Sequence, residues 1–223
     1  MTAVPAQPSS RPLTGVLACC ALACRRGRRL LFRGVDLEFA PGSITWLRGT
    51  NGSGKTSLMR ILAGLSPAAE GTVTWNGAPR RAGADAASAA VVYIGHTNAL
   101  KDDLTLAEAL TFHAELAGLD DAPGRARRSL ERLGLGRWQQ AAVRTLSQGQ
   151  RRRGALARLA LDDAARTWIL DEPFDALDQA GVEQLAGLLQ AHAVRGGAAL
   201  LTSHQAVALD GARVFDLEPH RLP

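Results

Sequence analysis

Apolar and polar positions alternate along the N-terminal part of the chain in the way that β-strands require. Strands are predicted over residues 13–24, 30–39, 44–47, 71–75 and 90–94. The dipeptide Asn76-Gly77 follows the fourth run and favours a tight hairpin turn. The fifth run is continuously apolar, which is typical of a buried strand. This part of the chain is therefore expected to be rich in β-sheet.

The apolar positions change to a helical period between about residue 104 and residue 161. Thr105 and Glu108 form the S/T-x-x-E pattern of a capping box, which predicts a helix start. The stretch 120–124 is predicted to break the helical pattern, which resumes over 127–133. A further helix follows residue 150, and Gly154 within it costs about 1 kcal/mol relative to Ala.

Strands and helices then alternate again to the end of the chain. Strands are predicted over 167–170, 198–203 and 213–217, and a helix carries an apolar stripe from 182 to 189. The pattern predicts an α/β fold, with one domain over 13–223 and an all-helical insert at about 104–161. Residues 1–12 are rich in Pro, Ser and Ala and lack an apolar run, so they are predicted to be a disordered tail.

Composition adds little to this picture. The net charge is +5 and the pI about 9.8, but the basic residues are nearly all arginine, as in chains from GC-rich genomes. The charge is therefore weak evidence for a partner, and no nucleic acid is expected. Cys19, Cys20 and Cys24 are interpreted as small buried hydrophobes, with a haem or metal role as the alternative. No apolar run reaches the roughly 18 residues that a membrane span needs.

The strongest local motif is a G-x-x-x-x-G-K-[ST] phosphate-binding loop over residues 49–56, between a predicted strand and a predicted helix. Its glycines allow backbone N–H groups to surround phosphate oxygens, and the helix N-terminus adds a positive dipole end. Lys55 is expected to reach the β- and γ-phosphates, and the Thr56 hydroxyl to hold Mg²⁺.

A second motif is the acidic pair Asp171-Glu172 at the carboxyl end of an apolar strand. Asp171 is expected in the Mg²⁺ shell. Glu172 is expected to polarise a water in line with the γ-phosphate. Ser147, in the run Leu-Ser-Gln-Gly-Gln, is expected to cap a helix and leave its N–H groups free for a phosphate.

With these motifs in this order, the chain from residue 13 onward resembles the ATP-binding cassette family, whose signature is Leu-Ser-Gly-Gly-Gln. Gln148 is a variant at the third position. The resemblance implies a P-loop NTPase (RecA-like) core with an antiparallel β subdomain and an inserted helical subdomain. It also implies ATP and Mg²⁺ as ligands, and a homodimer that encloses two ATP molecules.

The resemblance implies these site residues. ATP would be bound by Gly49, Thr50, Asn51, Gly52, Ser53, Gly54, Lys55, Thr56 and Ser57, and from the other protomer by Ser147, Gly149 and Gln150. Mg²⁺ would be held by Thr56 and Asp171. Glu172 would be the catalytic base, and His204 the switch histidine that contacts the γ-phosphate and the attacking water.

Two positions depart from the family pattern. His96 stands where relatives usually have a Gln that holds Mg²⁺ and water, and we hypothesise that it makes hydrolysis pH-sensitive. Arg26 lies near the position of the adenine-stacking aromatic ring. The run from Tyr93 to Thr105 is similar to the ATPase subunits of cytochrome c maturation haem exporters, which have the same Gly-His replacement.

The resemblance implies a transport ATPase, peripheral on the cytoplasmic side of a bacterial inner membrane, that drives integral membrane transporter subunits. Three alternatives remain: the ATPase of a lipid or peptide exporter, a soluble cassette ATPase of DNA repair or translation, and a small-metabolite kinase. The kinase leaves Leu146–Gln150 and His204 without a role, and the DNA-repair class is disfavoured by the absence of sustained heptads between Thr56 and Leu146.

Overall fold

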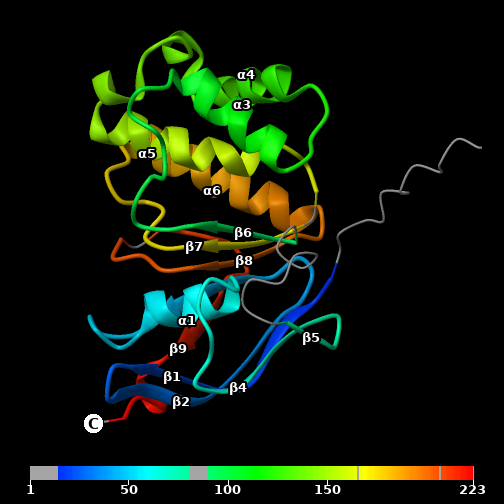
Figure 1. The fold of residues 1–223 in the computed structure, drawn as a ribbon, viewed down its shortest axis with the longest axis vertical. Helices are drawn as coiled ribbons and strands as arrows, with labels where there is room; N and C mark the ends of the chain where they lie inside the picture. The colour runs from blue at the N-terminus through cyan, green and yellow to red at the C-terminus, as the bar shows by residue number, and fades with distance from the viewer. Residues whose placement is uncertain (1–14, 81–89, 165, 206, 223) are drawn as a thin grey trace, which may run out of the picture.

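The computed structural model describes residues 15–80, 90–164, 166–205 and 207–222. Within these residues the strands form two sheets (Figure 1). One is antiparallel, in the order β2-β1-β4-β5, and the other is parallel, in the order β6-β7-β8-β3-β9. The predicted tail 1–12 lies outside the described residues.

The antiparallel sheet comes from the N-terminal part of the chain. Its strands are β1 (Leu17–Arg26), β2 (Arg29–Phe39), β4 (Glu70–Trp75) and β5 (Ala78–Arg80). Asn76 and Gly77, both with positive φ, form the predicted hairpin between β4 and β5. Together with α1 (Lys55–Leu62), this sheet lies on one side of the parallel sheet (Figure 1).

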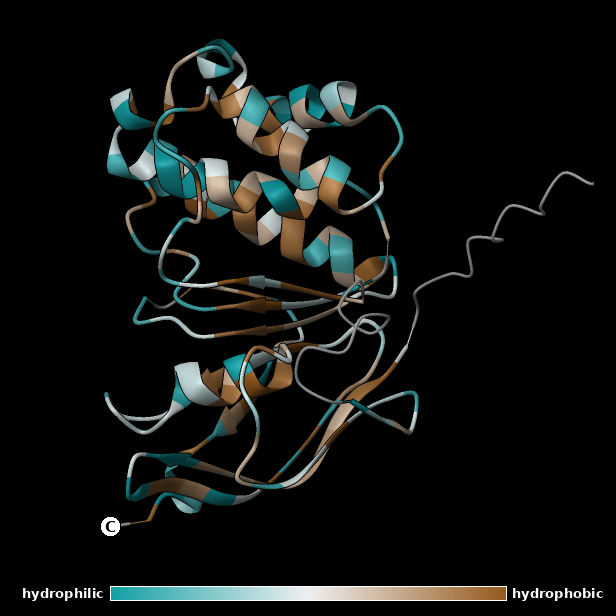
Figure 2. Ribbon diagram, viewed as in Figure 1, coloured by the Kyte–Doolittle hydropathy of each residue, from teal (hydrophilic) through white to brown (hydrophobic). Residues whose placement is uncertain are grey.

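The parallel sheet is made of short strands. They are β3 (Ile44–Arg48), β6 (Val91–Ile94), β7 (Thr167–Leu170), β8 (Ala198–Leu201) and β9 (Arg213–Asp216). In β7, Trp168 and Leu170 face one hydrophobic core and Ile169 faces the other, as the two-residue period of a strand requires. Figure 2 shows β7 and β8, whose residues are all buried, as a largely hydrophobic layer inside the molecule.

The other side of the sheet is covered by helices (Figure 1). The chain between β6 and β7 forms α3 (Leu106–Leu116), α4 (Ala122–Arg132), η1 (Gly136–Trp138), η2 (Val143–Thr145), α5 (Gln148–Leu156) and η3 (Ala157–Ala160). Helix α6 (Gln179–Val194) follows β7 and packs against the sheet. The short helix η4 (Glu218–His220) follows β9. No helix in the described ranges combines the length and apolar character needed to cross a bilayer.

Some sequence predictions are confirmed in detail and others are wrong. The Thr105 hydroxyl accepts from the Glu108 N–H at 3.2 Å, and the Glu108 carboxylate accepts from the Thr105 N–H at 2.8 Å, which completes the predicted capping box. The helix predicted from Arg127 begins instead at Ala122, because a proline in the first turn needs no N–H partner. Cys19 and Cys24 are buried as predicted, but Cys20 is exposed.

Gly154 has a packing explanation. A Cβ at this position would lie 2.8 Å from Leu106 Cδ1 and 3.3 Å from Leu100 Cδ1. Leu106 is fully buried at the start of α3, so α5 approaches α3 more closely than any larger residue would permit. The glycine that is unfavourable for helix formation thus allows the helical layer to pack.

Candidate functional site

The phosphate-binding loop connects β3 to α1 at the edge of the parallel sheet where its strands end. Gly54 caps α1 with a φ of 104°, and no acidic residue lies in the first turn of the helix. The N–H groups and the positive dipole end of α1 therefore face the loop. No carboxylate in the first turn of the helix neutralises this positive end. The Lys55 ammonium donates to the carbonyl oxygens of Gly49 at 2.8 Å and Thr50 at 3.2 Å.

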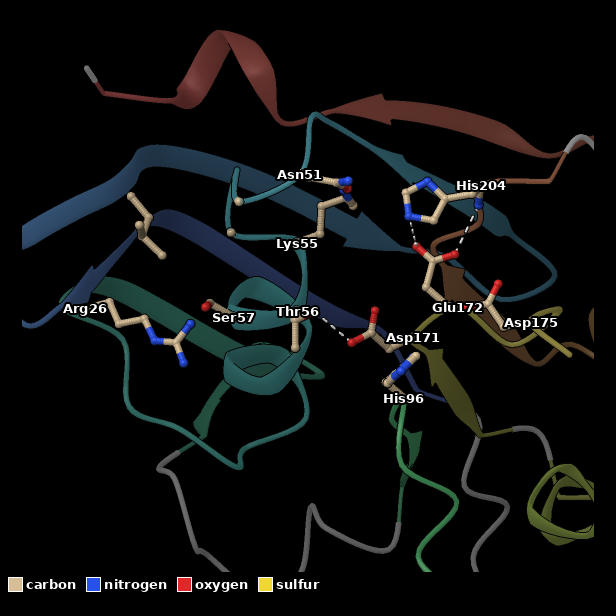
Figure 3. A pocket seen from close by; sticks show the side chains of 13 residues that line it. Arg26, Asn51, Lys55, Thr56, Ser57, His96, Asp171, Glu172, Asp175 and His204 are labelled. Carbon is tan, nitrogen blue, oxygen red and sulfur yellow. Dashed lines mark hydrogen bonds and ion pairs between the residues drawn. The ribbon is translucent and has the colours of Figure 1, made fainter. Parts of the chain in front are cut away.

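A cavity of about 380 Å³ lies over this loop (Figure 3). Its lining comes from the antiparallel sheet, the phosphate loop and the ends of β6, β7 and β8: Arg26, Leu31, Asn51, Gly52, Gly54, Lys55, Thr56, Ser57, His96, Asp171, Glu172, Asp175 and His204. Open sheets of this type bind ligands at the carboxyl ends of their strands. The cavity extends from the acidic pair across the loop to Arg26.

Other predicted residues lie outside this lining. Gly49 lines an adjoining cavity of about 460 Å³, together with Lys55 and His204. Ser53, within the loop, is fully buried. Thr50 contacts residues near the end of the chain. Ser147, Gly149 and Gln150 do not reach the cavity of their own chain.

Asp171 is a buried carboxylate, 4% exposed, held by two hydroxyl groups. Its Oδ2 accepts from Thr56 Oγ1 at 2.8 Å, and its Oδ1 accepts from Thr202 Oγ1 at 3.0 Å. Mg²⁺ favours such hard oxygen ligands and usually adds phosphate oxygens and water to one or two carboxylates. In the described part of the chain, no group of three or more His, Cys, Asp and Glu is arranged to hold a metal. A buried carboxylate beside a hydroxyl is a donor set of this kind, so Thr56 and Asp171 fit a Mg²⁺ ion that is shared with phosphate.

Glu172 has a φ of 48°, which is unusual for a residue with a side chain and costs about 1–3 kcal/mol. Its N–H donates to Thr202 Oγ1 at 2.9 Å, and its carboxylate accepts from the His204 N–H at 3.1 Å. The His204 Nε2 lies 3.6 Å from the carboxylate (Figure 3). The end of β8 thus holds Glu172 in a strained conformation that directs its side chain into the cavity.

Arg152, on α5, is buried and contacts the backbone of the site. This residue was not predicted from the sequence. The residue is 3% exposed, and its guanidinium donates to the carbonyl oxygens of Gly95 at 2.9 Å, Asp171 at 2.9 Å and Glu172 at 2.7 Å. Burial lowers its pKa, an effect that the nearby acids Asp175, Asp171 and Glu172 oppose. The only sequence signal was an arginine within an apolar helix face. Thr202 was missed for a similar reason, because its partners are some thirty positions away.

Ser147 caps α5. Its hydroxyl accepts from the Gln150 N–H at 3.2 Å, and the Gln150 side chain accepts from the Ser147 N–H at 2.8 Å. Gly149 lies so close to the loop after β7 that a Cβ would be 2.7 Å from the Ala176 carbonyl oxygen. The N-terminus of α5 is therefore fixed against the segment that follows the acidic pair.

The two departures from the family pattern both lie at the cavity. The His96 side chain is exposed at the end of β6, on the same side of the cavity as Asp171 (Figure 3). Its effect on the pH dependence stays a prediction. Arg26 lies on the side of the cavity away from Glu172, where a nucleotide base would lie if its phosphates occupied the loop (Figure 3).

Comparisons with known proteins agree with this geometry. A family model described as ABC transporter matches residues 32–175. The cytochrome c biogenesis ATP-binding export protein CcmA of Albidiferax ferrireducens is 47% identical over 83% of this chain and 88% of its own. Its namesake from Saccharophagus degradans is 42% identical over 90% and 92%.

Solved structures show the same fold. A putative ABC transporter ATP-binding protein from Pyrococcus furiosus has a TM-score of 0.79 at 18% identity, over 93% of this chain and 100% of the other. The ATP-binding subunit of another ABC transporter has a TM-score of 0.77 at 25% identity, over 85% and 79%. The predicted fold class is thereby confirmed.

Proposed function

The chain belongs to the ABC transporter family, among the cytochrome c biogenesis ATP-binding export proteins, and we propose that it is the ATP-hydrolysing motor of a haem export system for cytochrome c maturation. As a member of this family it binds ATP, dimerises and works with membrane transporter subunits. In our proposal, ATP binding closes a homodimer over two nucleotides and hydrolysis reopens it.

The position of the Glu172 carboxylate is the main observation that supports ATP hydrolysis. A carboxylate that is 13% exposed, fixed at the backbone and aimed into the cavity can take a proton from a water in line with the γ-phosphate. The water oxygen forms the new bond to phosphorus as the bond to the ADP oxygen breaks. His204, within 3.6 Å of that carboxylate, would orient the water and the γ-phosphate.

Lys55 and the N-terminus of α1 would hold the triphosphate. The Lys55 ammonium carries three N–H donors, so it can keep its contact with the Gly49 carbonyl and turn another donor toward phosphate oxygens. Thr56 and Asp171 would hold Mg²⁺, which neutralises charge on the β- and γ-phosphates when bound.

A second copy of the chain would complete each site. The cavity of the same chain is not lined by Ser147, Gly149 or Gln150. Ser147 nevertheless caps the N-terminus of α5, and a helix N-terminus is suited to binding a phosphate. This supports the proposal that they bind the γ-phosphate held by the partner copy.

The membrane partners would handle haem or a haem-carrier complex, and this chain would act on the cytoplasmic side of the bacterial inner membrane. They would dock between the parallel-sheet core and the helical layer, near residues 96–112. Phe112 and Leu116, on one side of α3, are 54% and 75% exposed and provide apolar contact area at this position.

The test is the variant Glu172→Gln, which keeps the shape of the side chain and removes the base. We expect hydrolysis to fall by roughly 100-fold or more while ATP is still bound, so that a dimer accumulates with ATP and Mg²⁺. Light scattering after size-exclusion chromatography measures the dimer, with Lys55→Ala as the control that binds ATP poorly and stays monomeric. Normal turnover by Glu172→Gln would show that Glu172 is not the base.

A further inference from the structure

The segment 217–222 folds back against the outside of the phosphate-binding loop. The Leu217 N–H donates to the Arg48 carbonyl oxygen at 3.0 Å, and the Leu217 side chain is fully buried. Farther along, Arg221 pairs with Phe32 of β2 in an isolated antiparallel bridge. The segment is thus held by β3 at one end and by β2 at the other.

Two side chains of this segment, Glu218 and Arg221, contact the loop residue Thr50. The Thr50 N–H donates to Glu218 Oε1 at 2.5 Å, and Arg221 Nη1 donates to Thr50 Oγ1 at 2.8 Å. Arg221 also pairs with Glu218 Oε2 at 3.1 Å. The backbone hydrogen bond from Thr50, its hydroxyl and Arg221 lower the pKa of the Glu218 carboxyl to about 2. Glu218 is therefore charged at neutral pH.

The geometry of one peptide group connects Glu218 to Lys55. The N–H of Thr50 and the carbonyl of Gly49 belong to the same planar trans peptide, so they point in opposite directions. Glu218 accepts from the N–H, and Lys55 donates to the carbonyl at 2.8 Å. Since the group is rigid, any contact that fixes its N–H also fixes the carbonyl on which Lys55 rests.

The preceding glycine leaves this peptide few other restraints. Gly49 has a φ of 150°, and a Cβ there would be 2.7 Å from Ser53 Oγ, so the position requires glycine. A glycine permits rotation that a side chain would prevent. The contacts from Glu218 and Arg221 supply the restraint from outside the loop.

We propose that Glu218 and Arg221 are positioning residues for nucleotide binding, which hold the Gly49–Thr50 peptide so that Lys55 is presented to the triphosphate. This rests on the proposed function. Neither residue lines the two cavities at the loop, so their effect is expected on the affinity for ATP. Loss of either should raise KM for ATP and leave kcat nearly unchanged, because Asp171 and the base Glu172 follow β7 and Thr56 lies on α1, outside the Gly49–Thr50 peptide.

The experiment compares steady-state ATP hydrolysis and the binding of a fluorescent ATP analogue in the purified chain with Mg²⁺. Glu218→Ala should raise KM and Kd by about 10-fold, since it removes a charge-assisted hydrogen bond, with kcat within about twofold. Glu218→Gln keeps an acceptor oxygen for the Thr50 N–H and should give a smaller increase. Glu38→Ala, an exposed glutamate of β2, is the control and should leave both constants unchanged.

A double-mutant cycle separates positioning from general stabilisation. Arg221→Ala and Thr50→Val should each raise KM, and together they should have little more effect than either alone, because they remove the same contact. Equal KM in wild type and Glu218→Ala would overturn the inference, as would a fall in kcat and melting temperature without a change in KM. If the wild type itself neither binds nor hydrolyses ATP, the proposed function is wrong and the inference fails with it.

Discussion

At the scale of the residue, Glu172 combines a catalytic side chain with an unfavourable backbone. Its φ of 48° is held by Thr202, Arg152 and His204, which all bind its backbone or its carboxylate. Strain of this kind persists only where the surrounding contacts outweigh it. These contacts therefore offset the backbone strain and keep the Glu172 carboxylate in place.

This strain predicts a difference between two inactive variants. Glu172→Ala and Glu172→Gly both remove the carboxylate, but only glycine adopts a φ of 48° without cost. We expect Glu172→Gly to be more stable than Glu172→Ala by roughly 1 kcal/mol. Urea unfolding of both variants at one pH measures the difference. Equal stability, or a more stable alanine variant, would mean that the backbone at this position is not strained.

Sequence reasoning at this scale finds residues whose neighbours along the chain carry the signal. Asp171 and Glu172 follow an apolar strand, and Lys55 lies in a contiguous motif. Glu218 could not be found in this way, because it is 168 positions from Thr50 and its own surroundings resemble any surface turn. Only the paths of β9 and the segment after it bring the two together.

At the scale of the element, the same distinction holds between local and long-range contacts. The capping boxes at the starts of α3 and α5 involve residues three apart, and Thr105–Glu108 was predicted from the sequence. The start of α4 was misjudged because Pro123 and Gly124 suit both a turn and a first helical turn. Burial of Ala122 and Gly124 decides in favour of the helix.

Helix α5 begins after its N-cap Ser147, and it contacts the residues that follow β6 and β7. Arg152 makes this connection through three carbonyl oxygens. Arg152→Met keeps much of the volume but leaves those carbonyls without a donor, so we expect a loss of roughly 2–4 kcal/mol in unfolding free energy. Urea unfolding measures it, with Arg127→Met, an exposed arginine of α4, as the matched control. A loss no larger than that of the control would contradict the role assigned to Arg152.

At the scale of the whole molecule, one sheet separates two hydrophobic cores, and α6 closes one of them with a buried histidine. His192, 1% exposed, stacks on Trp168 of β7 with ring centroids 3.5 Å apart, and its Nε2 donates to the Arg166 carbonyl oxygen at 2.8 Å. Burial, with a smaller contribution from Arg195, lowers the pKa of His192 to about 4. The folded protein therefore keeps this ring neutral at a pH where the unfolded chain would protonate it.

The sign of the resulting pH dependence follows from proton uptake. Between the unfolded pKa of about 6.5 and the folded value of about 4, the unfolded chain binds more protons, so stability falls as the pH is lowered. From pH 7 to pH 5, His192 should account for a loss of roughly 2 kcal/mol in unfolding free energy. His113, whose pKa burial also lowers to about 4, adds to the acid sensitivity of the wild type.

The variant His192→Gln isolates this contribution, because glutamine keeps an N–H donor for the Arg166 carbonyl and does not titrate. Its absolute stability will differ from that of the wild type, so the quantity to compare is the change in unfolding free energy between pH 7 and pH 5. We expect that change to be smaller in His192→Gln by roughly 2 kcal/mol, while the two proteins show parallel behaviour between pH 8 and pH 7. If both proteins lose the same free energy down to pH 5, the ring of His192 is protonated as readily in the fold as outside it, and its burial against Trp168 does not oppose the charge.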